Sequence, residues 1–240
     1  MDIKRIDKII ALNCNITRKE ARALIKEGAV TLNGQRVFRA QESVDIENDE
    51  ITVQGKAFDL KEHIYIMLNK PAGVISATND PKKETVIDIL PPNLKRRSLF
   101  PCGRLDRDTT GILIITDDGA LSHRLMSPSH HVYKTYIATL EKEIDECDIE
   151  RLENGIILDD KTKCLPARVK KMNINGSPAA QIMIREGKYH QVKRMFAACG
   201  NKVLHLHRSQ IGSLPLDPNL KEGEAREMTR QELELLFIEA

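Results

Sequence analysis

The sequence predicts an α+β protein with a small N-terminal domain and a larger C-terminal one. Its 240 residues suffice for one large or two unequal domains. Strand patterns outnumber helix patterns and do not alternate with them regularly, which argues against a doubly wound parallel sheet. A helix–helix–hairpin pattern precedes a polar stretch, so we expect domains at residues 1–54 and 64–240, with a linker at 55–63.

Composition places the chain among soluble globular proteins, with 41% hydrophobic and 30% charged residues. It contains no apolar run of about 18 residues, and its first residues lack an apolar signal core, so we expect a cytoplasmic protein without a membrane span. The five cysteines are scattered and form no Cys-x-x-Cys pair, which favours reduced thiols over disulfides or a zinc site. Walker loops and dinucleotide-binding fingerprints are also absent from the sequence.

The N-terminal pattern predicts two helices and a hairpin. Ile6, Ile9 and Ile10 are spaced as one face of a helix that ends near Asn13. Thr17 and Glu20 form a capping-box signature for a second helix, which Gly28 should terminate. The pair at residues 33–34, Asn-Gly, predicts a tight turn between two short strands.

Charge is distributed unevenly in this domain. Residues 1–40 contain nine Lys and Arg against four Asp and Glu, a net charge of +5, whereas residues 41–60 have a net charge of −5. Lys19, Arg22 and Lys26 share one face of the second helix, which is either a plain solvated face or an anion-binding one. The order of elements and the residues themselves resemble an S4 domain over about residues 2–50. The resemblance implies that these three cations contact structured RNA.

The larger domain should begin with a strand at 64–68, followed by Asn69-Lys70-Pro71 and a glycine turn. Further patterns predict a helix at 120–126, a loop at 127–131, strands at 133–140, 167–172, 179–184 and 203–208, a helix at 188–199, and a C-terminal helix capped by Thr229 and Glu232. His205 and His207 share a strand face, but no carboxylate or cysteine completes a metal site.

Residues 103–119 are the most informative segment. A charged loop with Arg104, Asp106 and Arg107 leads into the apolar run 112–115, and an Asp-Asp-Gly turn follows. A loop at the end of a buried strand is a common position for catalytic groups. Neighbouring cations favour an ionised carboxylate and attract a polyanion. The alternative is an ordinary solvated loop.

The segment Gly-Arg-Leu-Asp, Thr-x-Gly, apolar strand, Thr-Asp-Asp-Gly resembles the catalytic motif of RNA pseudouridine synthases, and most closely the RsuA family, which modifies ribosomal RNA. The resemblance implies an N-terminal S4 domain and a synthase domain built on a mixed, mainly antiparallel sheet. It makes Asp106 the catalytic residue. It also implies that Tyr136, in Lys-Thr-Tyr, stacks on a flipped base and assists proton removal from its C5.

The same resemblance extends to the block at residues 186–195. There it implies that Lys193 pairs with Asp106, although the two lie far apart in the sequence. This chain has Lys188 where many relatives have arginine. The RNA contacts that we expect in this domain are Arg104, Lys188, Arg194 and Arg208.

The expected function is therefore isomerisation of a specific uridine in small-subunit (16S) ribosomal RNA, which requires no cofactor and no metal because no atom enters or leaves. Asp106 would act either as a nucleophile at C1′ or as a base at C2′. We expect a monomer that acts on ribosomal RNA in a small-subunit assembly intermediate, away from membranes. Two alternatives are the same reaction on large-subunit RNA, and a non-catalytic RNA-binding assembly factor.

Overall fold

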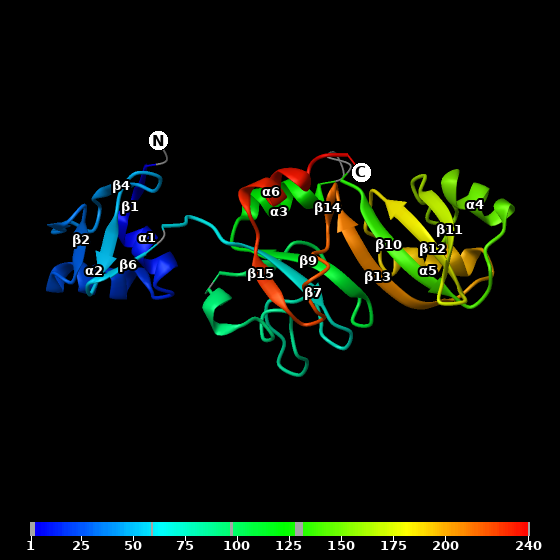
Figure 1. Cartoon of the computed structure of the whole chain (residues 1–240), viewed down its shortest axis with the longest axis horizontal. Coiled ribbons are helices and arrows are strands. Elements are labelled where there is room, and N and C mark those ends of the chain that lie inside the picture. The colour runs from blue at the N-terminus through cyan, green and yellow to red at the C-terminus, as the bar shows by residue number, and fades with distance from the viewer. Residues whose placement is uncertain (1–2, 59, 97, 128–131, 240) are drawn as a thin grey trace. The chain divides into compact units, whose positions relative to one another are not determined.

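The computed structural model describes residues 3–58, 60–96, 98–127 and 132–239. The chain folds as two compact units (Figure 1). Unit 1 is Met1–Ile64 together with Lys95–Leu99, and unit 2 is Tyr65–Leu94 together with Phe100–Ala240. Each unit is described separately below.

Unit 1 has the predicted helix–helix–hairpin order. Its elements are β1 (Ile3–Arg5), α1 (Ile6–Asn13), α2 (Arg18–Glu27), β2 (Val30–Leu32), β3 (Gln35–Arg36), β4 (Ser43–Asp45), β5 (Ile51–Val53) and β6 (Lys56–Ala57). The strands form a sheet of order β3-β2-β5-β6 and a separate β1–β4 pair. The predicted capping box opens α2, since Thr17 and Glu20 cap each other, and Gly28 ends the helix.

The core of unit 1 is aliphatic and includes Ile6, Ile9 and Ile10 of the predicted helix stripe. The polar stretch expected as a linker at 55–63 begins as a strand instead, because β6 pairs with β5. Gln54 and Gly55 take φ angles of 51° and 77°, the left-handed conformations that a tight hairpin turn requires. Asparagine usually precedes glycine in such turns. This chain has glutamine there, so the sequence did not predict the hairpin.

Unit 2 is built on one large sheet. Its strands are β7 (Tyr65–Lys70), β8 (Phe100–Pro101), β9 (Thr110–Thr116), β10 (Lys134–Leu140), β11 (Arg168–Ile174), β12 (Ser177–Ile184), β13 (Val203–Ile211), β14 (Leu214–Pro215) and β15 (Ala225–Glu227). The main order is β11-β12-β10-β13-β9-β7-β15, with β8 on β9 and β14 on β13. β9 and β13 pair in parallel and the other described pairs are antiparallel, which confirms the predicted mixed, mainly antiparallel sheet.

The helices of unit 2 include α3 (Gly119–Met126), α4 (Glu146–Glu153), α5 (Gln191–Ala198) and α6 (Arg230–Leu235). The sequence did not predict α4, and it predicted that α5 starts at residue 188. The helix begins later because His190 adopts a left-handed conformation, with φ 47°, so Lys188 to His190 remain in a loop. Most of the loop expected at 127–131 lies outside the described residues. In the described part of the chain, no helix is both long and apolar enough to cross a bilayer.

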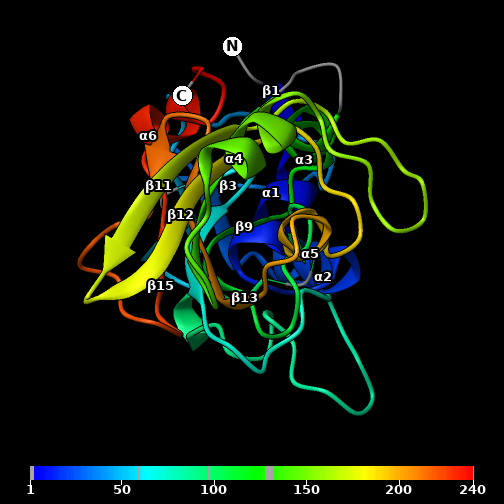
Figure 2. The same ribbon diagram turned by 90° about the vertical axis from the view of Figure 1, so that its right-hand side faces the viewer.

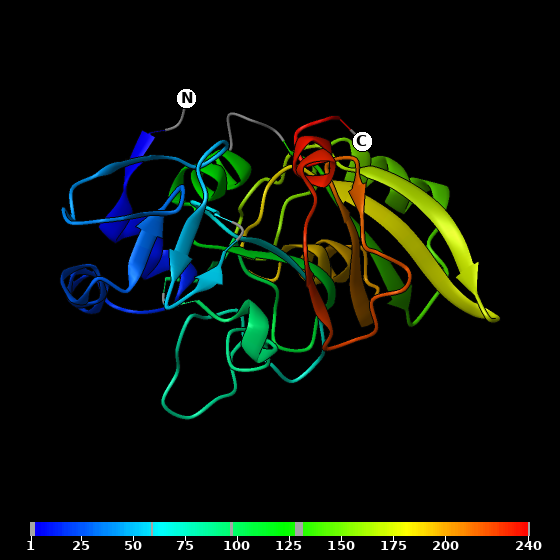
Figure 3. The same ribbon diagram turned by 60° about the vertical axis from the view of Figure 1, so that its left-hand side comes forward.

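The β11–β12 hairpin forms a long twisted ribbon at one edge of the sheet (yellow in Figures 2 and 3). Helix α4 packs beside it (Figure 2). Within the sheet, all of β9 and nearly all of β7 are buried. The loop between β8 and β9 leads into this buried part of the sheet.

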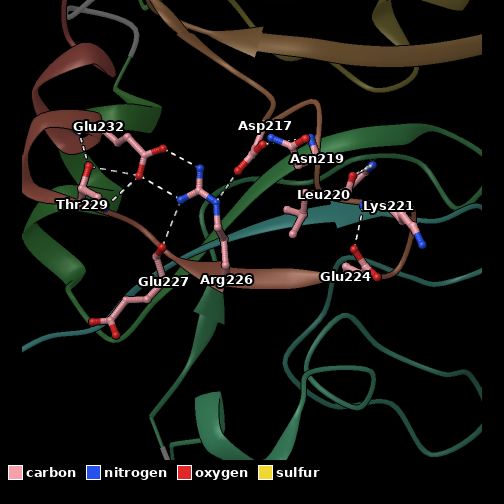
Figure 4. Close-up of polar contacts among 10 residues, drawn as sticks. Asp217, Asn219, Leu220, Lys221, Glu224, Arg226, Glu227, Thr229 and Glu232 are labelled. Atoms are coloured by element: carbon pink, nitrogen blue, oxygen red, sulfur yellow. Dashed lines mark hydrogen bonds and ion pairs between the residues drawn. The ribbon is translucent and has the colours of Figure 1, made fainter.

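A polar network closes the C-terminal part of unit 2 (Figure 4). Arg226 on β15 donates through Nε to Asp217, at 2.6 Å, and through Nη2 to Glu232, also at 2.6 Å. Glu232 caps α6 together with Thr229, as predicted. The Arg226 guanidinium is the main reason that the pKa of Glu232 falls to about 2. The network thereby joins α6 to β15, the neighbour of β7.

Candidate active site

Asp106 begins a tight turn between β8 and β9. The amide of Thr109 donates to the Asp106 carbonyl at 3.1 Å, and β9 starts at the next residue. Gly111 then pairs with Arg208 of β13. A Cβ at residue 111 would lie 2.2 Å from the Arg208 carbonyl oxygen, and its φ is +106°. Only glycine allows this close approach of the two strands, which explains the glycine of the Thr-x-Gly motif.

Lys70, at the end of β7, fixes the turn through hydrogen bonds to its backbone. Its side chain is fully buried, and Nζ donates to the carbonyl oxygens of Pro71 and Thr109 at 2.9 Å and of Arg107 at 3.3 Å. Burial lowers its pKa to about 8, against the raising effect of Asp108 and Asp106. A charged group in this position strengthens hydrogen bonds to the backbone of the loop, so Lys70 acts as a clamp on it.

The segment after Lys70 holds both neighbours of Asp106. The hydroxyl of Ser76 donates to the Leu105 carbonyl and accepts from the Leu105 amide, both at 3.0 Å. Arg107 donates through Nε to the Gly73 carbonyl at 2.8 Å, and the Gly73 amide donates back to the Arg107 carbonyl at 2.8 Å. The backbone on each side of Asp106 is therefore fixed before any substrate binds.

Lys193 of α5 forms the expected ion pair with Asp106. Its Nζ lies 3.1 Å from Asp106 Oδ2 and 2.6 Å from Asp108 Oδ1. Burial alone would lower the pKa of Lys193, but the hydrogen bonds that Lys193 donates to Asp108 and Asp106 outweigh it and raise the pKa above its ordinary value. The same hydrogen bond lowers the pKa of Asp108. Lys193 is therefore a permanent cation shared by two carboxylates.

His190 is a second neighbour of Asp106 that the sequence reading did not single out. Its Nε2 lies 3.5 Å from Asp106 Oδ1. Gln191 secures the loop around it, because its side chain accepts from the Lys188 amide at 2.9 Å and donates to Glu186 at 2.6 Å. The His-Gln pair of the sequence block thus shapes the approach to the carboxylate.

Tyr136 lies in the same pocket as Asp106. We call the cavity lined by Asp106, Tyr136, Ile184, Val192 and Leu206, together with Arg104, Leu105, Thr109, Gly187, Lys188, His190 and Gln191, the Asp106 pocket. Tyr136 is on β10, directly opposite Arg208 on β13. Aliphatic walls and one aromatic ring around a partly exposed carboxylate form a site suited to a flat polar ring.

The four expected RNA contacts of unit 2 are arranged differently from one another. Arg104 is exposed, lines the pocket, and has no side-chain partner among the described residues. Lys188 is held by Glu186 at 2.9 Å and by the Lys163 carbonyl at 2.7 Å. Arg194 pairs with two carboxylates, Asp159 and Asp160. Arg208 is buried and donates through Nε to the Ile112 carbonyl at 2.8 Å.

The expected RNA-binding face of unit 1 is only partly free. Lys19 and Lys26 are exposed on α2 and pair with no described side chain. Arg22 donates through Nε to Asp7 at 2.9 Å, and Arg5 and Arg18 bind the same carboxylate. Burial raises the pKa of Asp7, but these hydrogen bonds outweigh it and lower the pKa to about 2.

Sequence reasoning missed four residues of the site. Lys70, Ser76, Asp108 and His190 all gain their roles from contacts across the fold. Lys70 carried the best available signal, since it lies two residues after the apolar run 64–68 and directly before a proline. Asp108 stood beside Asp106 in the same motif, but spacing alone does not show which of two aspartates faces the pocket.

Comparison with known proteins agrees with this geometry. Residues 64–198 match the model of the RNA pseudouridylate synthase family, and residues 4–51 match the S4 domain. An uncharacterized RNA pseudouridine synthase of Bacillus subtilis, YtzG, is 46% identical over 97% of this chain and 98% of that protein. The ribosomal small subunit pseudouridine synthase A of Haemophilus influenzae is 41% identical over 97% and 99%, respectively.

A solved structure also matches nearly the whole chain. It is described as a pseudouridylate synthase, is 40% identical, and aligns with a TM-score of 0.66 over 97% of this chain and 99% of that chain. The predicted resemblance is therefore confirmed over both units. This chain, with its N-terminal S4 domain and its pocket around Asp106, belongs to the RNA pseudouridylate synthase family.

Proposed function

We propose that this protein converts a uridine of small-subunit ribosomal RNA to pseudouridine, and that Asp106 acts on the ribose of that nucleotide. One observation carries the catalytic assignment. Asp106 is a partly exposed carboxylate whose neighbours on both sides are fixed; it shares a pocket with the ring of Tyr136 and is paired with the Lys193 ammonium. The target class follows from the names of relatives about 40% identical over nearly the whole chain.

The reaction breaks the N1–C1′ bond and forms a C5–C1′ bond. The proton leaves C5 and N1 gains one, so the overall change balances without a cofactor or a metal. The target base must leave its stack to reach the carboxylate. Asp106 then either attacks C1′, which gives a covalent ester with the sugar, or removes the C2′ proton. A kinetic isotope effect on substrate deuterated at C2′ separates these routes, because only the second breaks that C–H bond.

Residues in the pocket and beside it have supporting parts in this proposal. Lys193 orients Asp106 and holds it next to the ribose. Tyr136 packs against the flipped base, a contact worth roughly 1–3 kcal/mol for stacked bases. Arg104 is the expected RNA contact with no protein partner among the described residues, so it is the best placed to bind the opened strand. Of the other expected RNA contacts, Lys188 lines the pocket, Arg194 is bound by Asp159 and Asp160, and Arg208 joins β13 to β9 through the Ile112 carbonyl.

The S4 domain supplies affinity in this proposal. Lys19 and Lys26 face solvent on α2, where they can bind phosphates of structured RNA. In this proposal residues 1–54 bind the RNA and residues 64–240 catalyse the reaction. The protein acts as a monomer, on ribosomal RNA in a small-subunit assembly intermediate.

The decisive experiment is pseudouridine mapping in both ribosomal RNAs, with the purified wild-type protein and with Asp106→Asn. Naked small-subunit RNA, a small-subunit assembly intermediate and large-subunit RNA serve as separate substrates. We expect one new pseudouridine in the small-subunit RNA, made by the wild type alone. Modification of the large-subunit RNA would overturn the target, and binding without modification of any RNA would support a non-catalytic assembly factor.

A further inference from the structure

A second hollow opens next to the Asp106 pocket. It shares Arg104, Tyr136 and Lys188 with that pocket, and its own walls include Lys134, Arg185 and Arg208. We call it the second hollow. The family resemblance gave Lys134 no role beyond its place in the Lys-Thr-Tyr triplet.

Three neighbouring strands bring these cations together. Lys134 and Tyr136 are two residues apart on β10 and therefore point to the same face of the sheet. Tyr136 pairs with Arg208 of β13, and Lys134 pairs with Ile184, the residue before Arg185. Ser209 is an extra residue in β13, because Thr135 pairs with Gln210 while Tyr136 pairs with Arg208. Bulges of this kind often re-aim a side chain near a functional site.

These cations lack anionic partners among the described residues. Lys134 is only 8% exposed and makes no side-chain hydrogen bond or ion pair there. Arg208 is 5% exposed, and it has acceptors for Nε and for Nη1, the Ile112 carbonyl and the Tyr136 hydroxyl. Its Nη2 has none, nor does Nε of Arg185. The one carboxylate in the wall, that of Glu186, is already bound by Lys188, Gln191 and the Leu165 amide. Burial, and then the charge of Arg208, lower the pKa of Lys134 to about 8.

Buried cations without anionic partners are costly, and proteins normally pair them. An anion from outside would remove the cost. A phosphodiester fits, because its two non-bridging oxygens, which share one negative charge, accept from lysine and arginine together. The proposed RNA substrate also brings a phosphate within one nucleotide of any base held by Tyr136.

We propose that Lys134, Arg185 and Arg208 bind a backbone phosphate adjacent to the target nucleotide, so that the second hollow is a phosphate subsite. This inference rests on the proposed function, since it takes RNA as the ligand. The subsite fixes the sugar from the phosphate side, while the Asp106 pocket holds the base.

The test compares ligands that differ only in phosphate. Binding of uridine, uridine 5′-monophosphate and uridine 3′-monophosphate to the full-length protein is measured by titration calorimetry or NMR. We expect Lys134→Met to weaken binding of one of the two monophosphates at least tenfold and that of uridine less than twofold. The exposed Lys170→Met, which removes the same charge from β11, should change none of the three.

Equal weakening of uridine and both monophosphates would overturn the proposal, since Lys134 would then serve the base. Unchanged monophosphate binding would overturn it as well. The 5′ and 3′ arms identify which phosphate is held.

A second measurement needs no variant and covers the case in which Lys134→Met misfolds. The Lys134 side chain is titrated by NMR in wild-type protein labelled with ¹³C at lysine Cε. A bound phosphate stabilises the ammonium form, so the monophosphate should move the titration to higher pH, whereas uridine should not. An unmoved titration with both monophosphates contradicts the subsite. Pseudouridine formation by the wild type is assayed separately, so failure of the reaction and failure of the subsite are distinguishable.

Discussion

The pattern arginine–aliphatic–aspartate occurs twice in this chain, and the two aspartates have different surroundings. Asp7, in Arg5-Ile6-Asp7, has a fully buried carboxylate held by Arg5, Arg18 and Arg22. Asp106, in Arg104-Leu105-Asp106, keeps 23% of its side chain exposed and pairs with Lys193. The same local sequence therefore yields a closed anchor in unit 1 and an open carboxylate in unit 2.

The difference shows what separates a structural carboxylate from one available for chemistry. Three arginines saturate Asp7 with hydrogen bonds and leave no room for a ligand. At Asp106 the position of the carboxylate is set through the backbone of the loop, by contacts of Lys70, Ser76 and Gly111. The carboxylate itself lines the pocket. Activity and stability measurements should therefore separate the two sites.

Asp106→Asn should produce the largest effect on activity. We expect pseudouridine formation to fall by about 10³-fold or more, as when an essential catalytic group is removed. The melting temperature should stay close to that of the wild type, because the side chain is partly exposed and the loop is held by other residues. Single-turnover assays and thermal unfolding check this. The affinity of the variant for RNA should stay within a few fold of that of the wild type. Substantial turnover by the variant would show that Asp106 takes no part in the chemistry.

Lys193 tests whether the open carboxylate depends on its cation. Lys193→Met should slow the chemical step by roughly 10- to 100-fold, within the usual range for misplacing a reacting group. Lys193→Arg should recover part of the rate, because it keeps the charge. Stability should change little, since ion pairs open to solvent contribute little to folding. If Lys193→Met and Lys193→Arg reduced the single-turnover rate equally, Lys193 would contribute through its geometry and not through its charge.

Asp7→Asn should affect stability alone. We expect unit 1 to lose about 2 kcal/mol, since several hydrogen bonds between a buried charge and arginines are broken. Hydrogen exchange of the α1 and α2 amides in the full-length chain measures this loss. Hydrogen exchange of the amides of unit 2 should stay unchanged. Glu27→Gln, which neutralises an exposed carboxylate on α2 and spares Asp7, is the matched control. Unchanged exchange in Asp7→Asn would mean that the arginine cluster is not an anchor.

The pH dependence of unit 1 follows from the same carboxylate. The pKa of Asp7 falls from 3.8 to about 2 in the fold, so its contribution is fully present above pH 3.8 and is lost as pH falls toward 2. Acid should therefore loosen α1 and α2 over this range in the wild type. In Asp7→Asn this part of the pH dependence should be missing, and hydrogen exchange at several acidic pH values measures both.

Local signals predicted most of the fold. Capping boxes at Thr17 and Thr229, the Asn-Gly turn and the buried runs of β7 and β9 are properties of neighbouring residues, and the structure contains each of them. The late start of α5 depends on a left-handed His190, which no propensity indicated.

The candidate site was less accessible from the sequence. The family motif pointed to Asp106 and Lys193, and the structure brings the two together. The clamp by Lys70 and the charges around Lys134 arise from strands that are adjacent only in the folded sheet. Arg22 illustrates the same limit, because its spacing on α2 is right for RNA while its guanidinium is bound to Asp7.

The smallest expected effect concerns that arginine, and it sharpens the contrast between anchored and free charges. Removal of an exposed lysine that binds a phosphate should reduce the magnitude of the slope of log affinity against log salt concentration by roughly 0.7–0.9. Lys26→Gln should do so for a small-subunit RNA fragment. Arg22→Gln should lower the slope by less than half as much, because Arg22 already neutralises Asp7 and releases fewer counterions. The comparison is made under conditions in which both variants are folded. Equal slopes would mean that RNA draws Arg22 away from Asp7, and the Asp7 cluster would then be part of the RNA-binding surface instead of a closed anchor.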